Sequence, residues 1–418
     1  MAFASAAEGP GMRSADALAP GATIELTVPE AARVGPIELR RLIDAVSRGD
    51  SGALAALRDD FPDHAAACDQ FVAALRQLIA GQPAAAAVAF GQVDASGWHV
   101  AASMFRAVAL ATNGWIGAGL ALANRMRDRL DAPGAEQDAA YMSDRGIITA
   151  GLQYIAAIDQ RHAPVAGKLP ISDPFRYVVS YPRSGSTMLA QFLCFAFAAP
   201  KYSVYPGDGR YFSRRFHDHE PGHAVFVKDH LWNEHYIADE TLFLVRDGRD
   251  AMLSFARFLY AEGHHDLIRR GQLAEFLRFS GQTLFGFWAD HARVVLDAQT
   301  RGARIQLVRY EEIFGNYKRL MALAHAIAGP VVTPRDDEQG FAQFRQAAKR
   351  RLVSPGWSER LTLPEDSYIP QDWSIGGGTI DWRHAFDGPA RRAFHELGGT
   401  DMLIRLGYET DQDWWRAG

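Results

Sequence analysis

The sequence FRYVVSYPRSGSTMLAQFLCFAF, residues 175–197, is the stretch around which the rest of the chain is organised. Its first part, Phe175–Ser180, is apolar and rich in aromatic and β-branched residues, which predicts a short buried strand. Its last part, Thr187–Phe197, is apolar nearly all round, which predicts a buried helix. A tight loop, Tyr181–Thr187, joins the two. The stretch therefore predicts a strand–loop–helix unit of an α/β protein.

The loop of this unit has the composition of an anion-binding site. Its residues Arg183, Ser184, Gly185, Ser186 and Thr187 supply one cation, three hydroxyls and one glycine. At a helix N-terminus, the loop N–H groups and the helix dipole both face a bound anion, and an arginine adds a full positive charge. We therefore expect these five residues to hold a phosphate-like group.

The composition is that of an ordinary globular protein. The chain has 418 residues, too many for one compact core, so we expect two domains. Its net charge of −5 argues against bulk nucleic-acid affinity but is compatible with a local anion pocket. No stretch reaches the length of a membrane span, and the N-terminus lacks the pattern of a signal peptide. Only two cysteines occur, in different predicted helices, so we expect a reducing compartment and a cytoplasmic protein.

The N-terminal part of the chain is predicted to be helical. Residues 1–34 are rich in Ala, Gly, Pro and Ser, which is typical of a disordered tail, and residues 35–165 show helical periodicity. Gly49, Gly81 and Gly114 open three similar segments, spaced by 32 and 33 residues, which resembles tetratricopeptide-type helical hairpins. An irregular helical bundle is the alternative. Stacked hairpins would offer a concave surface to a protein partner or to an extended acceptor substrate.

The pattern changes after a Pro-rich linker at residues 163–174. From residue 172 to residue 418, predicted strands alternate with helices, which indicates an α/β domain with a mostly parallel, doubly wound sheet. Four strands are predicted, at Phe175–Ser180, Ala224–Lys228, Thr241–Val245 and Arg304–Val308. Because ligands bind beyond the carboxyl ends of parallel strands, we expect the polar residues that follow these strands to share one anion site.

The second and third strands end in residues suited to such a site. Lys228 and His230 follow the second strand, and Arg246 follows the third. Ser254 lies eight residues after Arg246, within the next predicted helix, so the two side chains can hold one phosphate from two sides. The alternative is that Arg246 pairs with Asp250 and that Ser254 has no specific role.

The order of these motifs resembles that of the sulfotransferases that use 3′-phosphoadenosine 5′-phosphosulfate (PAPS). The loop YPRSGST resembles the Tyr-Pro-Lys-Ser-Gly-Thr-Thr loop that holds the 5′-phosphosulfate in that family. Lys228-Asp229-His230 matches the Lys-Thr-His segment that supplies the catalytic base, and Arg246 with Ser254 matches the pair that holds the 3′-phosphate. With the two motifs given next, five motifs occur in the right order. Together they are specific, although each alone is weak to moderate.

Two further motifs extend the resemblance to about residues 172–410. Arg309-Tyr310-Glu311 matches the family's Arg-Tyr-Glu element. Gly377 and Gly378, followed by Trp382, echo a C-terminal Arg-Lys-Gly-x-x-Gly-Asp-Trp signature.

The resemblance implies a P-loop NTPase-like sulfotransferase fold and transfer of a sulfuryl group from PAPS to a hydroxyl or amine, without a metal ion. It implies that His230 is the general base and that Arg183 and Lys228 stabilise the transferring group. Asp229 is the reserve candidate for the base, although we expect it to be a turn or cap residue. The co-substrate contacts that the resemblance implies are Arg183, Ser184, Gly185, Ser186, Thr187, Arg246, Ser254, Tyr310, Gly377 and Gly378.

This chain departs from the family pattern in two places. Arg183 replaces a lysine, and because arginine stays charged its role is electrostatic rather than proton-donating. Ile375 and Gly376 replace the C-terminal Arg-Lys pair, so other cations must serve the 3′-phosphate. The candidates are Arg383 and the basic run at residues 349–351, which is otherwise a solvated helix face.

Three alternatives stay open. The histidine-rich stretch 217–223 and the pair His264-His265 invite a metal site, but they lie in loops without a second ligand-bearing element, and we expect no metal. A nucleotide kinase or NTPase is a rival, although the loop lacks the form G-x-x-x-x-G-K-[ST]. A non-catalytic helical-repeat scaffold with a degenerate nucleotide-binding domain is the other. The acceptor class does not follow from the sequence.

Overall fold

The computed structural model describes residues 65–95, 100–132, 135, 141–161, 174–205, 208–215, 223–261, 263, 266–329, 332–352, 362–369 and 382–416. Several expectations fall outside these residues. They are the N-terminal tail, Gly49 of the helical repeat, the linker up to residue 173, the histidine-rich stretch before His223, the pair at 264–265, and Gly377 with Gly378.

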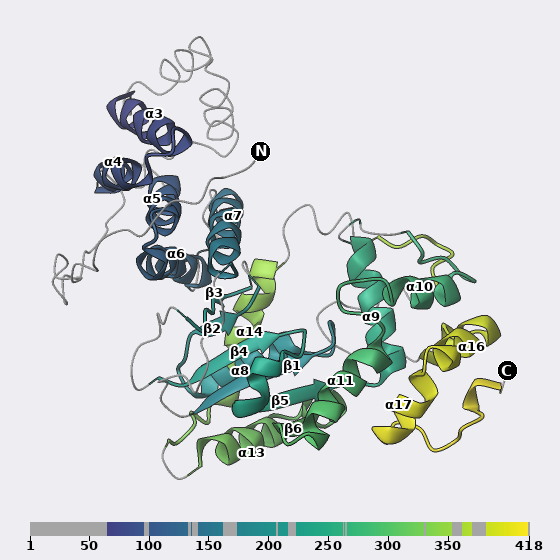
Figure 1. The fold of residues 1–418 in the computed structure, drawn as a ribbon. Coiled ribbons are helices and arrows are strands. Elements are labelled where there is room, and N and C mark those ends of the chain that lie inside the picture. Colours follow the sequence, from purple (N-terminus) through teal and green to yellow (C-terminus); the bar gives the residue numbers. More distant parts are fainter. Residues whose placement is uncertain are drawn as a thin grey trace.

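A six-stranded parallel sheet forms the centre of the C-terminal part (Figure 1). Its order is β3-β2-β4-β1-β5-β6, so β1 lies between β4 and β5, and the α/β expectation is confirmed. The four predicted strands are present, with ends that differ by at most one residue. β2 and β3 are too short to show the period-two pattern that predicts a strand. The strands are β1 (Phe175–Ser180), β2 (Lys201–Ser203), β3 (Arg210–Tyr211), β4 (Val225–Asp229), β5 (Glu240–Val245) and β6 (Arg304–Arg309).

Helices cover both faces of this sheet, which is why the central strands are nearly continuous apolar runs. Val178 and Phe226 pack on one face with α8, α13 and α14, and Tyr177 and Val227 pack on the other with α9, α10, α11, α16 and α17. The bounds are α8 (Ser186–Ala196), α9 (Gly248–Ala261), α10 (Leu273–Ser280), α11 (Trp288–Thr300), the short α12 (Tyr310–Ile313), α13 (Tyr317–Ala328), α14 (Glu338–Leu352), α16 (Gly388–Glu396) and α17 (Gly399–Arg405), with short 3₁₀ turns η3 (Glu234–Ala238), η4 (Trp382–His384) and η5 (Trp414–Arg416).

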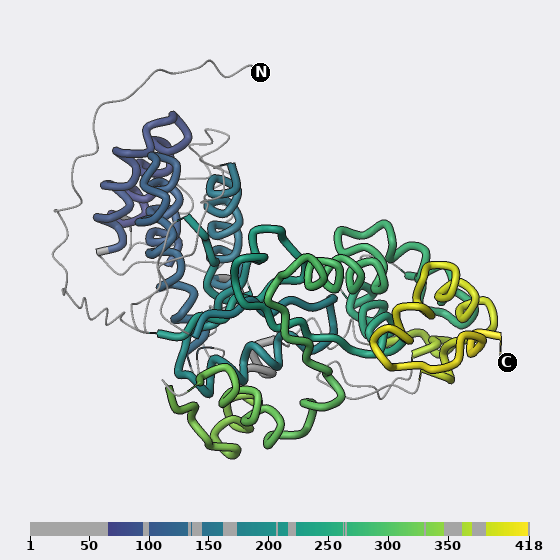
Figure 2. Tube along the Cα trace, turned by 60° about the horizontal axis from the view of Figure 1, so that its bottom comes forward, coloured from purple at the N-terminus to yellow at the C-terminus, as the bar shows by residue number. Residues whose placement is uncertain are grey.

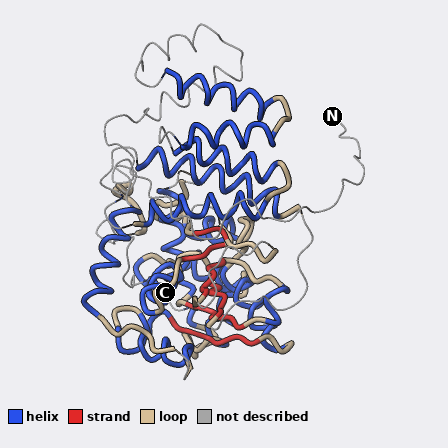
Figure 3. The backbone as a smooth tube through the Cα atoms, turned by 90° about the vertical axis from the view of Figure 1, so that its left-hand side faces the viewer, coloured by secondary structure: helices blue, strands red, loops and turns tan. Residues whose placement is uncertain are grey.

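Helices also make up the described residues before the sheet, and they stack side by side (Figure 3). We call them the helical unit: α3 (Ala65–Ile79), α4 (Pro83–Ala95), α5 (Val100–Thr112), α6 (Ile116–Asp131) and α7 (Tyr141–Asp159). Gly81 and Gly114 lie in the α3–α4 and α5–α6 turns, with φ of 73° and 89°, a conformation that favours glycine. The two glycines thus occupy the expected turns, while the tetratricopeptide assignment stays a prediction.

The helical unit packs directly on the edge strand β3 (Figure 1). The side chain of Asn124 in α6 accepts a hydrogen bond from the Tyr211 N–H (2.9 Å) and donates one to the Tyr211 carbonyl (3.1 Å). Asp128 in α6 accepts from the Arg210 guanidinium with both oxygens, at 2.8 and 2.5 Å. Asp159 at the end of α7 accepts from the Tyr211 hydroxyl at 3.1 Å. The helical unit therefore protects a sheet edge that would otherwise be open.

The C-terminal helices α16 and α17 lie at the other end of the molecule from the helical unit (Figure 2). Across the ranges given above, no helix is long and apolar enough to span a bilayer. Cys68 in α3 and Cys194 in α8 are both buried, and no disulfide joins them.

Candidate functional site

The loop between β1 and α8 is shaped by two residues with left-handed backbone. Gly185, the N-cap of α8, has φ 97°, and Arg183 has φ 67°. A Cβ atom at Gly185 would lie 2.5 Å from the ring of Tyr310, so a side chain does not fit there. Glycine offers no capping group, and the first N–H groups of α8 have no partner within the helix. The loop therefore has backbone donors of the kind that can bind an anion, which stays a prediction for this chain.

A hydroxyl within this loop lacks a partner. The Ser184 side chain is fully buried, and among the described residues its Oγ has no hydrogen-bond partner. A buried polar atom without a partner is costly and uncommon in a native structure. An oxyanion bound in the loop would satisfy this hydroxyl.

Arg246, at the end of β5, is buried and linked to the same loop. Its Nη1 donates to the carbonyl oxygen of Arg183 at 3.2 Å, and its guanidinium lies over the Tyr310 ring, 4.7 Å from the ring centroid. Arg246 also pairs with Asp250 at 3.6 Å, as the structural alternative expected. Ser254 does have a specific contact, because its Oγ accepts from Arg183 Nε at 3.5 Å. The β1–α8 loop and α9 therefore form one continuous surface.

This surface carries two guanidinium groups close together, that of Arg246 buried and that of Arg183 half-buried. Burial and the nearby Arg246 charge lower the pKa of Arg183 to about 10. Burial raises the pKa of Asp250 to about 7, even though Arg246 opposes the shift. Two like charges in a poorly solvated site repel one another, and an anion between them relieves that repulsion. The electrostatics of the site therefore favour a negatively charged ligand.

Lys228 lies at the end of β4, next to β1 in the sheet, and is buried. Its Nζ donates to Thr187 Oγ1 at 3.0 Å and to the Asp208 carboxylate at 2.6 Å. The contact with Thr187 places the Lys228 ammonium at the start of α8. Asp208 is a contact that the sequence reasoning missed. Asp208 lies between β2 and β3. Polar residues that follow a parallel strand are candidates for the site, but Asp208 becomes one only when β2 is recognised as a strand.

His230 follows Lys228 with its ring fixed by the backbone. Its Nδ1 lies 3.0 Å from the carbonyl oxygen of Ser180, and a carbonyl only accepts, so Nδ1 carries the hydrogen and Nε2 the lone pair. Burial, reinforced by the Lys228 charge, lowers the pKa of His230 to about 3. His291 in α11 supports this turn, because its Nε2 donates to the His230 carbonyl oxygen at 2.7 Å. The imidazole is thus neutral near pH 7, with Nε2 as the basic atom.

Asp229 is engaged in holding its surroundings together. Its carboxylate accepts from the Tyr205 hydroxyl at 2.9 Å, from the Tyr236 hydroxyl, and from the Leu231 N–H at 2.9 Å. With these donors around it, the carboxylate acts as a turn and anchor residue. The reserve assignment of Asp229 as a base finds no support in these contacts.

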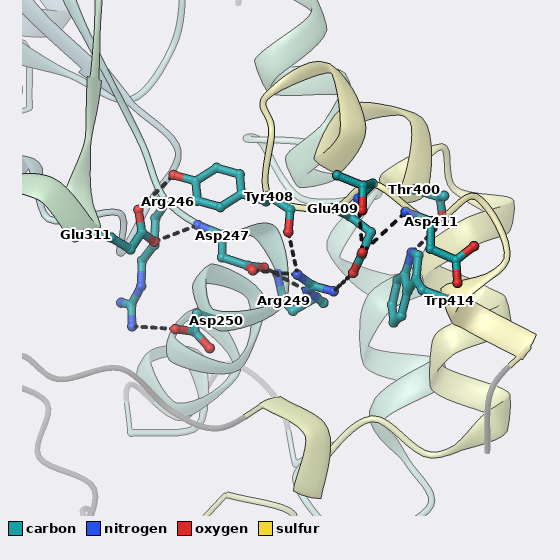
Figure 4. Close-up of polar contacts among 11 residues, drawn as sticks. Arg246, Asp247, Arg249, Asp250, Glu311, Thr400, Tyr408, Glu409, Asp411 and Trp414 are labelled. Carbon is teal, nitrogen blue, oxygen red and sulfur yellow. Dashed lines mark hydrogen bonds and ion pairs between the residues drawn. The ribbon is translucent and has the colours of Figure 1, made fainter.

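The strand end that carries Arg246 is linked by hydrogen bonds to α12, the short helix after β6, and to the C-terminal segment (Figure 4). Glu311, which follows Tyr310 in α12, accepts from the Asp247 N–H at 3.0 Å and from the Tyr408 hydroxyl at 2.8 Å. The predicted Arg309-Tyr310-Glu311 element thus supports the site, because the Tyr310 ring packs against both Gly185 and the Arg246 guanidinium.

Arg249 is the second anchor in this network (Figure 4). It is buried, pairs with Asp247 at 2.7 Å and Glu409 at 3.0 Å, and lies between the rings of Trp382 (3.9 Å) and Trp414 (4.9 Å). Glu409 is 160 positions away in sequence and Trp414 lies further still, which is why the sequence reasoning did not find these partners. The turn that positions Arg246 is therefore held by the end of the chain.

The remaining candidates are Arg383, the basic run at 349–351, and Gly377 with Gly378. Arg383 lies over the ring of Trp382, 4.7 Å from its centroid. The basic run at 349–351 belongs to α14, but the side chains of these residues, like Gly377 and Gly378, lie outside the description. Within the described part of the chain, no group of three or more His, Cys, Asp or Glu residues is arranged to hold a metal ion.

No protein-family model matches the sequence, and no curated protein matches it significantly. Among solved structures, the mouse sulfotransferase SULT7A1 complexed with PAP is 18% identical, with a TM-score of 0.37 over 57% of this chain and 89% of that chain. Retinol dehydratase in a complex with retinol and PAP is 14% identical, with a TM-score of 0.36 over 56% of this chain and 82% of that chain. The fold described above rests on the sheet order and the helix layers alone.

Proposed function

We propose that this chain transfers a sulfuryl group from PAPS to a hydroxyl or amine of an acceptor. The observation that carries the proposal is the joined surface of Arg183, Arg246 and Ser254, in which Arg246 Nη1 lies 3.2 Å from the Arg183 carbonyl oxygen and Arg183 Nε lies 3.5 Å from Ser254 Oγ. A ligand with one phosphate on the β1–α8 loop and another on the Arg246 side needs two anion sites that are linked in this way.

The residues fit the two ends of such a ligand. The N–H groups and hydroxyls of Ser184, Gly185, Ser186 and Thr187 hold the phosphosulfate end, and the unpartnered Ser184 Oγ gains an acceptor there. Arg246 and Ser254 hold the 3′-phosphate. Tyr310 packs against both half-sites and fixes their spacing. Gly377 and Gly378, from the C-terminal sequence motif, are the last two residues that we assign to the co-substrate site.

Three side chains carry the chemistry. PAPS supplies an activated sulfuryl group, and adenosine 3′,5′-bisphosphate (PAP) is the product. Arg183 and Lys228 stabilise the negative charge that develops on the transferring and leaving oxygens. Nε2 of His230 accepts the acceptor's proton, because Nδ1 is already committed to the Ser180 carbonyl. The sulfuryl group carries less negative charge than a phosphoryl group, so these cations serve where phosphoryl transfer uses Mg²⁺.

The contacts of Asp229 favour this reaction over nucleotide hydrolysis. A kinase or NTPase of this fold class uses a strand-end carboxylate for Mg²⁺. Asp229, the carboxylate at the end of β4, is instead engaged by the hydroxyls of Tyr205 and Tyr236. We propose that no metal ion is required. The acceptor class stays open, while a role of the helical unit in binding a protein or an extended acceptor and the cytoplasmic location stay predictions.

The direct experiment follows the fate of the labelled sulfuryl group. The full chain is incubated with sulfur-labelled PAPS, with EDTA present, against a panel of phenols, sugars, lipids, peptides and amines. We expect label to appear on one acceptor class and the same reaction to fail with Arg183→Ala. Tight PAP binding with no transfer to any acceptor would favour the scaffold alternative. Metal-dependent hydrolysis of ATP in the same preparation would favour the NTPase.

A further inference from the structure

Lysine is rare in this chain, and two lysines converge on one carboxylate. The sequence contains five lysines, Lys168, Lys201, Lys228, Lys318 and Lys349. Lys201 Nζ lies 2.5 Å from Asp208 Oδ1, and Lys228 Nζ lies 2.6 Å from Asp208 Oδ2. Each oxygen of the carboxylate thus holds one ammonium. None of the sequence motifs includes Asp208 or Lys201.

The position of Asp208 is built into the backbone around it. The Asp208 N–H donates to the Tyr205 carbonyl at 3.2 Å. The next residue, Gly209, has φ 129°, and a Cβ atom there would lie 2.6 Å from the Lys201 carbonyl oxygen. β2 in turn pairs with β4, with Ser203 opposite Lys228. Gly209 therefore lies tightly against β2, and the ion pair with Lys228 places Asp208 at the end of β4.

The residues that follow Asp208 are held by the helical unit. Two residues after Asp208, Arg210 binds both carboxylate oxygens of Asp128 in α6. Tyr211 is held through its backbone by Asn124. The residues that directly follow Asp208 are thus held both by β2 and by α6.

The charges around Lys228 give this anchoring a consequence. Burial lowers the pKa of Lys228, and the positive charges of Lys201, on β2, and Arg183, on the β1–α8 loop, lower it further. Asp208 opposes them, and His230 faces the ammonium from the end of its own strand. Burial raises the pKa of Asp208, yet the two lysines hold it well below its usual range, so the carboxylate stays charged.

We propose that Asp208 is a positioning residue that holds the Lys228 ammonium against Thr187 and keeps it protonated for the reaction, with Lys201 as the partner that shares the carboxylate. The role in the reaction rests on the proposed function, whereas the control of Lys228 by Asp208 is a property of the free protein. Lys228 can stabilise a leaving oxygen only as the ammonium, so loss of Asp208 weakens the step without removing any group that contacts the co-substrate.

The small number of lysines makes the ionisation of Lys228 directly measurable. The full-length protein is labelled with ¹³C at the lysine ε carbons, and the five signals are followed by NMR as the pH is raised. Lys228→Gln assigns its signal by absence. In Asp208→Asn we expect the Lys228 midpoint to fall by about one to three pH units, the effect of losing an opposite charge at this distance. In Lys201→Gln we expect the midpoint to rise, because a like charge is removed.

The opposite signs protect the test against a general folding defect, which would move both variants the same way. The midpoints of Lys318 and Lys349 and the thermal unfolding midpoint are the controls. A Lys228 midpoint that is unchanged in Asp208→Asn overturns the proposal, and so does a fall in Lys201→Gln. If Asp208→Asn does not fold, a fall of the Lys228 midpoint in Lys201→Gln still overturns the proposal.

A second readout separates this inference from the proposed function. With PAPS and an identified acceptor, Asp208→Asn is expected to keep PAP affinity within a few-fold, lower kcat, and move the basic limb of the pH–kcat profile toward neutral pH. A lysine shift without any transfer in the wild type would contradict the proposed function and leave the Asp208 inference standing. Normal transfer with an unmoved basic limb would overturn the inference and leave the function standing.

Discussion

Nε of Arg183 lies 3.5 Å from Oγ of Ser254, which joins the β1–α8 loop to helix α9 across 71 positions of sequence. The sequence places both residues in an anion site but in different halves of it. The contact makes the two halves one surface, so a change at either residue should affect a ligand that spans both.

Ser254→Ala is expected to weaken PAP binding about fivefold to tenfold, the effect of losing one hydrogen bond of about 1 kcal/mol together with the orientation of Arg183. The fold should be unchanged, since the substitution removes one buried hydroxyl. Isothermal titration calorimetry gives the affinity. Ser280→Ala, which removes another buried serine hydroxyl in α10, is the matched control and should bind as the wild type does. Equal affinities in both variants would show that Ser254 does not contact the ligand.

Gly185→Ala tests the shape of the loop. Gly185 has φ 97°, and the added Cβ would meet the Tyr310 ring at 2.5 Å. We expect a loss of about 2–4 kcal/mol in the free energy of unfolding, from left-handed strain and overpacking, and loss of PAP binding. Gly388→Ala at the start of α16, where a Cβ meets nothing within 4 Å, is the control. Urea unfolding of the two variants side by side decides; a wild-type midpoint for Gly185→Ala contradicts the account.

His230→Gln tests the assignment of the base. We expect kcat to fall about 10²- to 10⁴-fold, as for loss of general base catalysis, with PAP affinity little changed. The pH dependence has a definite sign. The pKa of His230 in the free protein is lowered to about 3, so the acid limb of kcat/KM should lie well below pH 6.5. A bound anion favours the imidazolium, so the limb of kcat should lie higher. Turnover within a few-fold of the wild type would remove His230 from this role.

Asn124→Ala tests how the helical unit is held to the sheet. The substitution leaves the N–H and carbonyl of Tyr211 without their partners at a buried edge. We expect a loss of about 2–6 kcal/mol in unfolding free energy, since each of the two unsatisfied buried groups costs about 1–3 kcal/mol. Asn124→Asp keeps the acceptor but loses the donor, so its free energy of unfolding should lie between those of the wild type and Asn124→Ala. A variant as stable as the wild type would mean that water replaces the side chain.

The strands and the first loop were predictable because their signals are local. β1, β4 and β5 contain short, mostly buried apolar runs, and β6 shows apolar residues at alternating positions followed by Val308. The relation of Arg246 to the loop was predictable from chain order, because parallel strands bring their carboxyl ends together.

The partners of these residues were not predictable, because they come from weak or distant signals. β2 and β3 have three and two residues, too few for a periodic pattern, and Asp208 lies between them. Tyr408 and Glu409, which hold Glu311 and Arg249, come from the end of the chain. A charge in a loop does not reveal which distant charge it meets, and only the fold decides the pairing.

The most direct test of the account is whether Arg246 reads a 3′-phosphate. Binding of PAP and of 5′-AMP, which lacks that phosphate, is measured by calorimetry with EDTA present, for the wild type, Arg246→Gln and Arg304→Gln. Arg304 is an exposed arginine at the opposite end of the sheet and serves as the matched control.

We predict that the wild type and Arg304→Gln bind PAP much more tightly than 5′-AMP. Arg246→Gln should lose about 2–3 kcal/mol for PAP, or about 30- to 150-fold, and almost nothing for 5′-AMP. Equal affinity of the wild type for PAP and 5′-AMP, or an equal loss for both ligands in Arg246→Gln, would contradict the proposal that this site holds PAPS by two phosphates.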